Sequence, residues 1–404
     1  MVQIMKKSKD IVLLTTKYAD DKKDAWLTNE LAYSLLDEGN KISVVVFSWL
    51  KNEPASFAKM IDGIDVIRVK LPSFFYNTGV VGTALKVFLF PFFARHEVKR
   101  HVKKCDLLIA NTPCVTILGM SRYFRKKYNS QTYLVLWDFF PYYLKDLGAI
   151  RNKFFFGFFR YLEQLMYKSF DRIGCMTDGN AKFLFDNFPE VDPKRVEILP
   201  LWAKIKQVDP VDRSAIRAKY HLPSTGFIAV YGGAMSIVQE LDNILDLAEL
   251  YSGSDITFLF IGRGTEKERL ETSAVNRGLR NIRFIDYVPR DEYQHVVQAC
   301  DVGLISLSKK LTVPSFPSKS LDYFKVSLPV LASLDPVTDF GDILENKICA
   351  GFAVVAGDVA KLKDKLDLLI NDAELCKALG ANGRQYYEKY LSVENARSII
   401  ISSL

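Results

Sequence analysis

The sequence has few of the residues from which metal sites and disulfide frameworks are built. Its 404 residues include six cysteines and four histidines. The cysteines are scattered without a CxxC pair, and the histidines are not clustered. This spacing predicts neither a zinc site nor a disulfide framework, and it is typical of a protein that folds in a reducing cytoplasm.

Long apolar runs and long blocks of one charge are also missing. No run reaches the roughly 20 residues of a membrane-spanning helix, and the charged N-terminus does not have the pattern of a signal peptide. The formal charge of +7 is spread along the chain, which makes nucleic acid a poor partner and an anionic membrane surface a better one. We therefore expect a cytoplasmic protein that associates peripherally with the inner face of the cell membrane.

The sequence does contain a regular alternation of strand and helix patterns in both halves. Short apolar, β-rich runs are separated by amphipathic segments such as residues 25–37, 241–251 and 266–277. This alternation predicts an α/β protein with two facing, Rossmann-like, doubly wound domains. The expected strands are residues 11–15, 42–47, 66–69, 106–110, 132–136, 172–176, 196–199, 228–231, 257–261, 282–285, 302–305, 330–332 and 352–355.

The boundary between the two domains is expected in a proline-flanked stretch at residues 200–210. Residues 1–203 then form the N-terminal domain and residues 210–387 the C-terminal domain. The chain is expected to end in one long helical segment, residues 382–404.

The most informative stretch is residues 313–333, VPSFPSKSLDYFKVSLPVLAS. It predicts a tight loop, a helix that opens at Ser318, and a buried strand. A serine at a helix start accepts hydrogen bonds from the first free amides, and those amides attract anions. Lys319 in the first turn opposes the helix dipole, and Asp322 follows one turn later on the same face. An anion site, a cation and a carboxylate that can bind hydroxyl groups suit a sugar nucleotide. The alternative is an ordinary loop and capped helix, which explains the same residues.

Three loops of the second half follow predicted strands, at the edge where parallel sheets bind ligands. In the first loop, Gly232 and Gly233 allow backbone amides to approach a phosphate closely. In the second, Arg263 stands between two glycines and supplies a cation, or it is a surface arginine in a tight turn. In the third, Tyr287 and Val288 follow a strand. Taken alone, this loop indicates only the end of a strand.

Taken together, these segments resemble the nucleotide-binding region of the retaining glycosyltransferases of family four, which have the GT-B fold. The resemblance is greatest to the bacterial surface-polysaccharide branch, through the PSK sequence that ends at Lys319 and the GxxxxxxQ pattern that ends at Gln239. The sequence departs from the family in two places. The first of the family's two glutamates corresponds to Pro314 and the second to Asp322, and the segment after the glycine pair has no cation.

The resemblance implies a hexosyl or N-acetylhexosaminyl transferase that takes a nucleotide sugar, with UDP as the expected nucleotide, and retains the anomeric configuration. It implies a polyprenol-linked glycan as acceptor and a C-terminal helix, from about residue 388, that crosses back to the first domain. No cofactor and no metal site are expected beside the donor. The residues expected to bind the donor are Gly232, Gly233, Gln239, Arg263, Tyr287, Val288, Ser318, Lys319 and Asp322.

The chemical step is assigned to three residues. Arg263 and Lys319 would stabilise the charge on the departing diphosphate in place of a metal ion. Asp138 follows a predicted strand of the first half and is the candidate that binds or deprotonates the acceptor hydroxyl, with a turn or helix-cap carboxylate as the alternative.

Two alternatives remain open at this point. The departures from the family pattern also fit a non-catalytic GT-B subunit that activates a partner transferase. Residues 74–104 and 151–172 combine aromatic clusters with several lysines and arginines. They are expected to lie on an anionic membrane surface, or else to form the core of the first domain.

Overall fold

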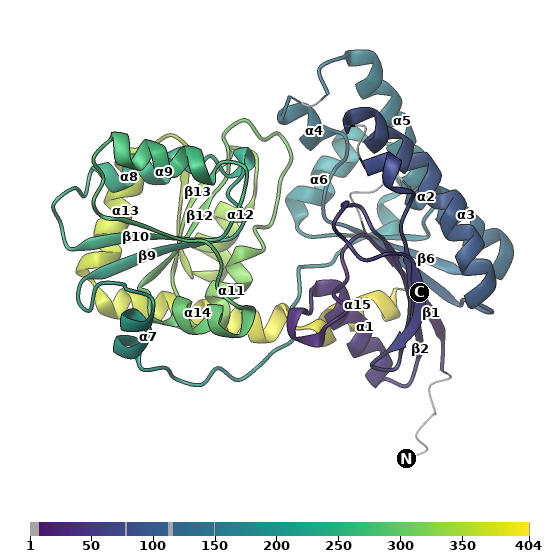
Figure 1. The fold of residues 1–404 in the computed structure, drawn as a ribbon, viewed down its shortest axis with the longest axis horizontal. Coiled ribbons are helices and arrows are strands. Elements are labelled where there is room, and N and C mark those ends of the chain that lie inside the picture. Colours follow the sequence, from purple (N-terminus) through teal and green to yellow (C-terminus); the bar gives the residue numbers. More distant parts are fainter. Residues whose placement is uncertain (1–7, 77–78, 112–115, 149, 404) are drawn as a thin grey trace. The chain divides into compact units, whose positions relative to one another are not determined.

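A computed structural model describes residues 8–76, 79–111, 116–148 and 150–403 (Figure 1). The chain divides into two compact units, which we call unit 1 (Met1–Leu201 with Val393–Leu404) and unit 2 (Trp202–Ser392). The division falls inside the stretch at residues 200–210 in which the sequence predicts the boundary.

Unit 1 is built on a sheet with the order β3-β4-β2-β1-β5-β6-β7-β8. Its neighbouring strands are parallel, except that β3 runs antiparallel to β4. The central strands are apolar throughout because helices cover both faces of such a sheet. The strands are β1 (Asp10–Thr15), β2 (Lys41–Phe47), β3 (Phe57–Ile61), β4 (Ile64–Val69), β5 (Leu107–Asn111), β6 (Gln131–Leu136), β7 (Arg172–Cys175) and β8 (Val196–Ile198). The helices are α1 (Leu27–Asp37), α2 (Gly79–His101), α3 (Ile117–Tyr128), α4 (Tyr142–Asp146), α5 (Lys153–Lys168), α6 (Asp178–Asn187) and α15 (Val393–Ser402).

Unit 2 contains a parallel sheet with the order β11-β10-β9-β12-β13-β14. In Figure 1, α8 and α9 lie over one face of this sheet and α11 and α14 over the other. The strands are β9 (Phe227–Gly232), β10 (Ile256–Ile261), β11 (Ile282–Ile285), β12 (Val302–Ser306), β13 (Val330–Leu334) and β14 (Gly351–Val355). The helices are α7 (Arg213–Lys219), α8 (Asp242–Glu249), α9 (Lys267–Asn276), α10 (Arg290–Gln298), α11 (Lys319–Lys325), α12 (Phe340–Asp342), α13 (Val359–Asn371) and α14 (Ala373–Tyr390). The predicted fold class of two doubly wound α/β domains is confirmed.

The strand order determines where each unit can bind a ligand. In unit 2, β9 lies between β10 and β12, so the chain leaves β9 toward one side of the sheet and later returns to its other side. The crossovers on the two sides of such a point diverge and leave a crevice outside the carboxyl ends of the strands. In unit 1 the corresponding position lies between β1 and β5.

The predicted C-terminal helix is wrong in its length. Two helices, α14 and α15, replace it, with Leu391 and Ser392 between them. The backbone N–H of Ala203 donates to the carbonyl of Leu391 at 2.8 Å, and Ala203 pairs with Ser392 as an isolated bridge. Since α14 belongs to unit 2, the part that returns to unit 1 begins at Val393 rather than near residue 388.

Arg397 fixes α15 to unit 1. Its Nη1 donates to the carbonyl and hydroxyl oxygens of Ser34 at 3.1 and 3.0 Å, and its Nη2 lies 2.9 Å from a carboxylate oxygen of Glu38. Both partners are at the end of α1, so the two helices are joined directly.

Candidate functional site

The loops after β9, β10 and β11 and the segment that leads into α11 lie along one edge of the unit 2 sheet. The strands are parallel and adjacent in space, so their carboxyl ends share an edge. The first two loops also bond to each other. Gly233 N–H donates to Ile261 O and Met235 N–H to Arg263 O, each at 2.9 Å. The sequence predicted these loops correctly and predicted their common edge.

The two glycines after β9 have different roles. Gly233 has a φ of +138°, and a Cβ atom on it would lie 2.8 Å from Cε of Lys319. It therefore leaves room for the lysine stem to lie against the backbone. A Cβ on Gly232 would lie 1.8 Å from the hydroxyl oxygen of Tyr293 in α10, so this glycine is explained by packing. Both glycines are therefore explained by the side chains packed against them, and phosphate binding at either one stays a prediction.

Lys319 is the cation at the centre of this edge. It is the first residue of α11, as predicted, and its Nζ donates to Oε1 of Gln239 at 2.8 Å. The same Nζ lies 5.1 Å from the ring centroid of Tyr231, at the end of β9. Lys319 is half-buried as a whole residue, and neighbouring groups crowd around its ammonium group. This desolvation lowers the pKa of Lys319 to about 8, and the nearby charge of Asp322 partly opposes the shift.

Gln239 joins the loop after β9 to α11. It ends a short 3-10 helix, Ile237–Gln239, and its Oε1 also lies 3.2 Å from the hydroxyl of Tyr231. The side chain accepts from two donors on different elements, so the cluster of Tyr231, Gln239 and Lys319 is held in one arrangement. The sequence pattern identified Gln239 but gave no indication of its contact with Lys319.

Ser318 does not act as the predicted helix cap. Its φ and ψ of −61° and −19° are helical, and its side chain makes no capping hydrogen bond. An N-cap residue needs an extended backbone for its oxygen to reach the free amides. The turn is closed instead by Ser320, whose hydroxyl donates to Pro317 O at 2.7 Å. Ser318 remains an exposed residue at the start of α11, beside Lys319.

A buried tyrosine sets the position of α11. The hydroxyl of Tyr323 lies 3.2 Å from Val230 O, 3.0 Å from Leu304 O and 3.2 Å from Gly232 N. It thus connects α11 to β9 and β12, the two strands at the crevice. Asp322 precedes it and is half-buried. Sequence reasoning missed Tyr323, because an aromatic residue in a helix predicts core packing and says nothing of a polar contact to a strand.

Arg263 and Tyr287 come together at the outer part of the edge. The guanidinium carbon of Arg263 lies 5.2 Å from the ring centroid of Tyr287, and both side chains are exposed. The Val288 side chain is buried, which leaves only its backbone to contact a ligand. Arg263 is therefore a partly ordered cation on the same edge as Lys319.

Asp138 lies in unit 1, two residues after β6, and so at the carboxyl edge of that sheet as predicted. Asp138 is an exposed residue, and protein atoms crowd around its carboxyl group. Desolvation raises the pKa of Asp138 to about 6. A carboxylate with such a pKa can exchange a proton near neutral pH.

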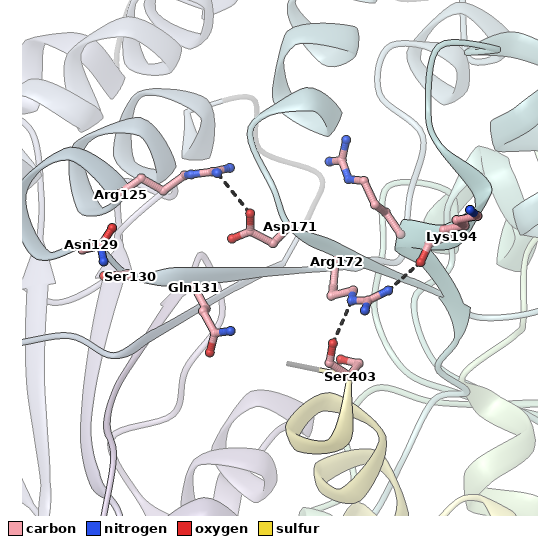
Figure 2. A pocket seen from close by; sticks show the side chains of 9 residues that line it. Arg125, Asn129, Ser130, Gln131, Asp171, Arg172, Lys194 and Ser403 are labelled. Atoms are coloured by element: carbon pink, nitrogen blue, oxygen red, sulfur yellow. Dashed lines mark hydrogen bonds and ion pairs between the residues drawn. The ribbon is translucent and has the colours of Figure 1, made fainter.

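A polar pocket of about 630 Å³ lies at the opposite, amino edge of the unit 1 sheet (Figure 2). Arg125 donates to Ser169 O at 3.1 Å, Arg195 to Tyr167 O at 2.7 Å, and Arg172 to Ser403 O at 2.7 Å. These carbonyls belong to the C-terminal ends of α5 and α15, where cations compensate the helix dipole. Figure 2 shows Arg172 reaching the carbonyl oxygens of Ser403 and Lys194. The arginines of this pocket are thus explained by helix capping.

Within the described ranges, no group of three or more histidine, cysteine, aspartate or glutamate side chains is arranged to hold a metal ion. In the same part of the chain, no helix combines the length and the apolar character needed to cross a bilayer.

Comparison with known proteins finds a family match within unit 2. Residues 212–386 match the family model described as glycosyl transferases group 1. The chain is 25% identical over 221 residues to the putative colanic acid biosynthesis glycosyl transferase WcaI of Escherichia coli, an alignment that spans about half of each protein (53% of this chain and 52% of WcaI). It is 23% identical to the probable glycosyltransferase WbjE of Pseudomonas aeruginosa over 74% of this chain and 75% of that protein.

Solved structures with the same fold include HepE of Anabaena in complex with UDP, at a TM-score of 0.68 and 14% identity, with 98% of this chain and all of that chain covered. Likenesses of this kind show that the two units together have the GT-B fold.

Proposed function

We propose that this protein is a retaining glycosyltransferase that moves a sugar from a nucleoside diphosphate, with UDP as the nucleotide, to a lipid-linked glycan in the synthesis of a surface polysaccharide. The observation that carries the proposal is the desolvated ammonium of Lys319 at the crevice of unit 2, held by Gln239 beside Gly233. A buried cation next to an open backbone is an arrangement suited to a diphosphate. The name of one bacterial relative, a putative colanic acid biosynthesis glycosyl transferase, supports the polysaccharide context.

In this proposal the diphosphate is bound by Lys319 and Arg263. Departure of the nucleotide develops negative charge on the outer phosphate, and preorganised donors at that point lower the barrier. Lys319 already gives up solvation before the donor arrives, so its charge is most effective when the phosphate charge grows. Two protein cations then do the work that a divalent metal does in other transferases.

The nucleoside is assigned to the same edge. Asp322 is one turn after Lys319 on α11 and would accept hydrogen bonds from the ribose hydroxyls. Tyr287 is exposed beside Arg263 and offers a ring for the base, together with the backbone of Val288. Ser318 contributes its hydroxyl at the start of α11, and Gly233 its open backbone. Asp138 of unit 1 would bind or deprotonate the acceptor hydroxyl.

The lipid-linked acceptor is proposed because α2 exposes an apolar stripe. Leu85, Phe88 and Phe92 are exposed at helical spacing, and Phe92 is 70% exposed. Phe90 and Ala94 on the other side of the helix are fully buried. Exposed aromatics in one row are uncommon on a monomer and mark a contact surface. The sequence left core and membrane as alternatives for this segment. One face of the helix is core, and membrane contact by the exposed face is part of this proposal.

The stripe of α2 continues into a basic end. Lys99 follows Phe92 two turns later on α2, Lys103 lies just beyond the end of the helix, and both are exposed. Lys104 is not counted among the cations available to a membrane, because its Nζ is paired with Asp10 and Asp106 at 3.0 and 2.6 Å. An apolar stripe that runs into exposed cations suits a helix lying in the interface of an anionic bilayer.

A second aromatic surface lies on α5. Phe154 is 82% exposed, and Phe155, Phe158 and Tyr161 are also exposed, whereas Met166 is buried. We refer to the exposed large apolar side chains of α2 and α5, all aromatic except Leu85, as the aromatic surface (Leu85, Phe88, Phe92, Phe93, Phe154, Phe155, Phe158 and Tyr161). In this proposal the aromatic surface contacts the membrane.

The test is a donor screen with the full chain in EDTA. UDP-glucose, UDP-galactose, UDP-N-acetylglucosamine and UDP-N-acetylgalactosamine are each incubated with undecaprenyl-diphosphate-linked N-acetylglucosamine in phosphatidylglycerol vesicles, and products are identified by mass. We expect a lipid product carrying one added sugar of α configuration. A protein that binds UDP but transfers nothing would favour the non-catalytic subunit, the reading that Pro314 also favours.

A further inference from the structure

The turn that carries Gln239 ends in a backbone conformation that side chains rarely adopt. Glu240 follows the short helix Ile237–Gln239 with φ and ψ of +41° and +55°, in the left-handed region. Glycine enters this region without steric cost, whereas the Cβ atom of another residue crowds the neighbouring carbonyl oxygen. A residue as long as glutamate persists in such a conformation where the surrounding structure holds it there. The contacts of Glu240 therefore show what holds this turn.

These contacts come from the end of β12 and the loop that follows it. Oε2 of Glu240 accepts from the backbone N–H of Lys309 at 2.8 Å, and its carbonyl oxygen accepts from the hydroxyl of Ser306 at 3.3 Å. The backbone N–H of Ser308 also donates to Val238 O at 2.8 Å. Three hydrogen bonds thus fasten the turn between β9 and α8 to the end of β12.

Gln239 lies between the two fastened residues, Val238 and Glu240. Its Oε1 accepts from Nζ of Lys319 at 2.8 Å. A hydrogen bond weakens steeply when its angle departs from the preferred geometry, so this contact depends on where the glutamine oxygen is placed. Glutamine is a flexible side chain, and the backbone of the turn is what gives its oxygen a fixed origin. The bonds of Glu240 therefore act on the contact between Gln239 and Lys319.

The choice of glutamate at this position costs stability. A glycine would form the same turn without strain, but it would offer no carboxylate to the amide of Lys309. Glutamate accepts the strain and gains a hydrogen bond in which the acceptor is charged. Strained residues of this kind gather at functional sites, where the strain serves to hold a particular arrangement. Its place beside Gln239 indicates that the arrangement is that of the Lys319 ammonium.

We infer that Glu240 is a positioning residue for the donor site: its carboxylate fixes the turn that orients Gln239, and through Gln239 it holds the ammonium of Lys319 where the diphosphate binds. The inference rests on the proposed function, in which Lys319 binds that diphosphate. It goes further because it gives a role to a residue that acts through Gln239, and because it adds the loop after β12 to the supports of the site.

The test compares Glu240→Gly, Glu240→Gln and His221→Gly in the full chain. Glycine removes the carboxylate together with the strain, so it separates a loss of position from a loss of stability. Glutamine keeps an oxygen for the amide of Lys309. His221 is the matched control, because it is an exposed residue before β9 with a φ of +53°. The melting temperature, UDP affinity by calorimetry in EDTA, and kcat with the probes of the donor screen are measured.

We expect Glu240→Gly to keep or raise the melting temperature and yet to lower kcat by roughly tenfold, the effect of one well-placed hydrogen bond. UDP affinity should fall less, by about threefold, because the position of the cation matters most where the phosphate charge grows. The acceptor KM should not change. Glu240→Gln should restore kcat to within about twofold of the native protein. His221→Gly should leave kcat and UDP affinity unchanged.

A double-mutant cycle asks whether Glu240 acts through Gln239. In a Gln239→Ala background, Glu240→Gly should lower kcat by less than about twofold, because the oxygen that it positions is already gone. Losses that simply multiply in the double variant would show that the two residues act independently, and would overturn the inference.

A Glu240→Gly variant with native kcat and UDP affinity, or losses that Glu240→Gln does not restore, would also overturn the inference, and the proposed transferase would stand. A native protein that binds no UDP would instead remove the proposed function, and the inference with it. Measurement of the native protein alone therefore distinguishes the two failures.

Discussion

At the scale of single residues, the account depends on Lys319 acting on charge that grows during the reaction. We expect Lys319→Ala to lower kcat by roughly a hundredfold and to weaken UDP binding less, by about tenfold, because a charge-assisted hydrogen bond is strongest where the phosphate charge is greatest. Lys310→Ala is the matched control, since Lys310 is an exposed lysine of the same segment before α11. Stopped reactions for kcat and calorimetry for UDP separate the two effects. Equal losses in rate and affinity would assign Lys319 to binding alone.

The pH dependence of the reaction follows from two shifted groups. Lys319 must be protonated to bind a diphosphate, and its lowered pKa of about 8 means that this charge is lost as pH rises through 8. Asp138 must be ionised to accept a proton, and its raised pKa of about 6 means that the carboxylate is lost as pH falls through 6. The profile of kcat/KM, which reports the free enzyme, should therefore be bell-shaped between these values. Lys319→Arg should move the upper limit to higher pH, and a fixed upper limit in that variant would speak against the assignment.

The sequence predicts where residues lie in the fold better than it predicts what their side chains contact. The strand and helix patterns were sufficient to assign Arg263 and Asp138 to carboxyl ends of strands and Lys319 to the first turn of a helix. The direction of each side chain depends on backbone angles and on partners far away in sequence. Ser318 has a helical backbone and so cannot cap, and Gly232 accommodates a tyrosine of α10. Neither fact is contained in the local sequence.

At the scale of elements, the two aromatic helices lead to a prediction for vesicle binding. We expect the native protein to sediment with phosphatidylglycerol vesicles at low salt, and less with phosphatidylcholine vesicles or at high salt, where the cations are screened. Phe92→Ser should reduce binding at all salt concentrations, because it removes buried apolar area rather than charge. Val275→Ser is the control, since Val275 is a 78% exposed residue of unit 2 outside the aromatic surface. Equal binding by both variants would remove α2 from the membrane contact.

Two elements were not obtained correctly from the sequence. Strand β3 was missed because its side chains are mostly exposed and carry no apolar alternation, although the Asp62-Gly63 pair, with φ of +48° and +81°, is a recognisable hairpin turn. The break between α14 and α15 depends on the backbone contact of Ala203 with Leu391, almost two hundred residues apart. Helix periodicity continues across this point, so a local pattern predicts one helix.

At the scale of the whole molecule, the two units differ in what their sequences reveal. The match to the group 1 glycosyl transferases is confined to residues 212–386, inside unit 2. Every nucleotide-sugar donor contains a diphosphate and a ribose. A site for these groups needs loops in a fixed order, and that order is recognisable in the sequence. The acceptor side depends on surface shape and on contacts between distant residues, which have no sequence signature. Sequence patterns therefore indicate the proposed donor site, and they indicate neither the sugar nor its acceptor.

The most direct test of the central claim is a calorimetric titration of the full chain with UDP in EDTA, for the native protein and for Asp322→Ala. The account predicts that the native protein binds UDP without metal, and that Asp322→Ala weakens binding by one to two orders of magnitude, as expected for a lost charged hydrogen bond of about 1.5–3 kcal/mol. Lys310→Ala should bind like the native protein. Binding that requires Mg²⁺ or Mn²⁺, or an unchanged affinity in a folded Asp322→Ala variant, would contradict the proposed donor site.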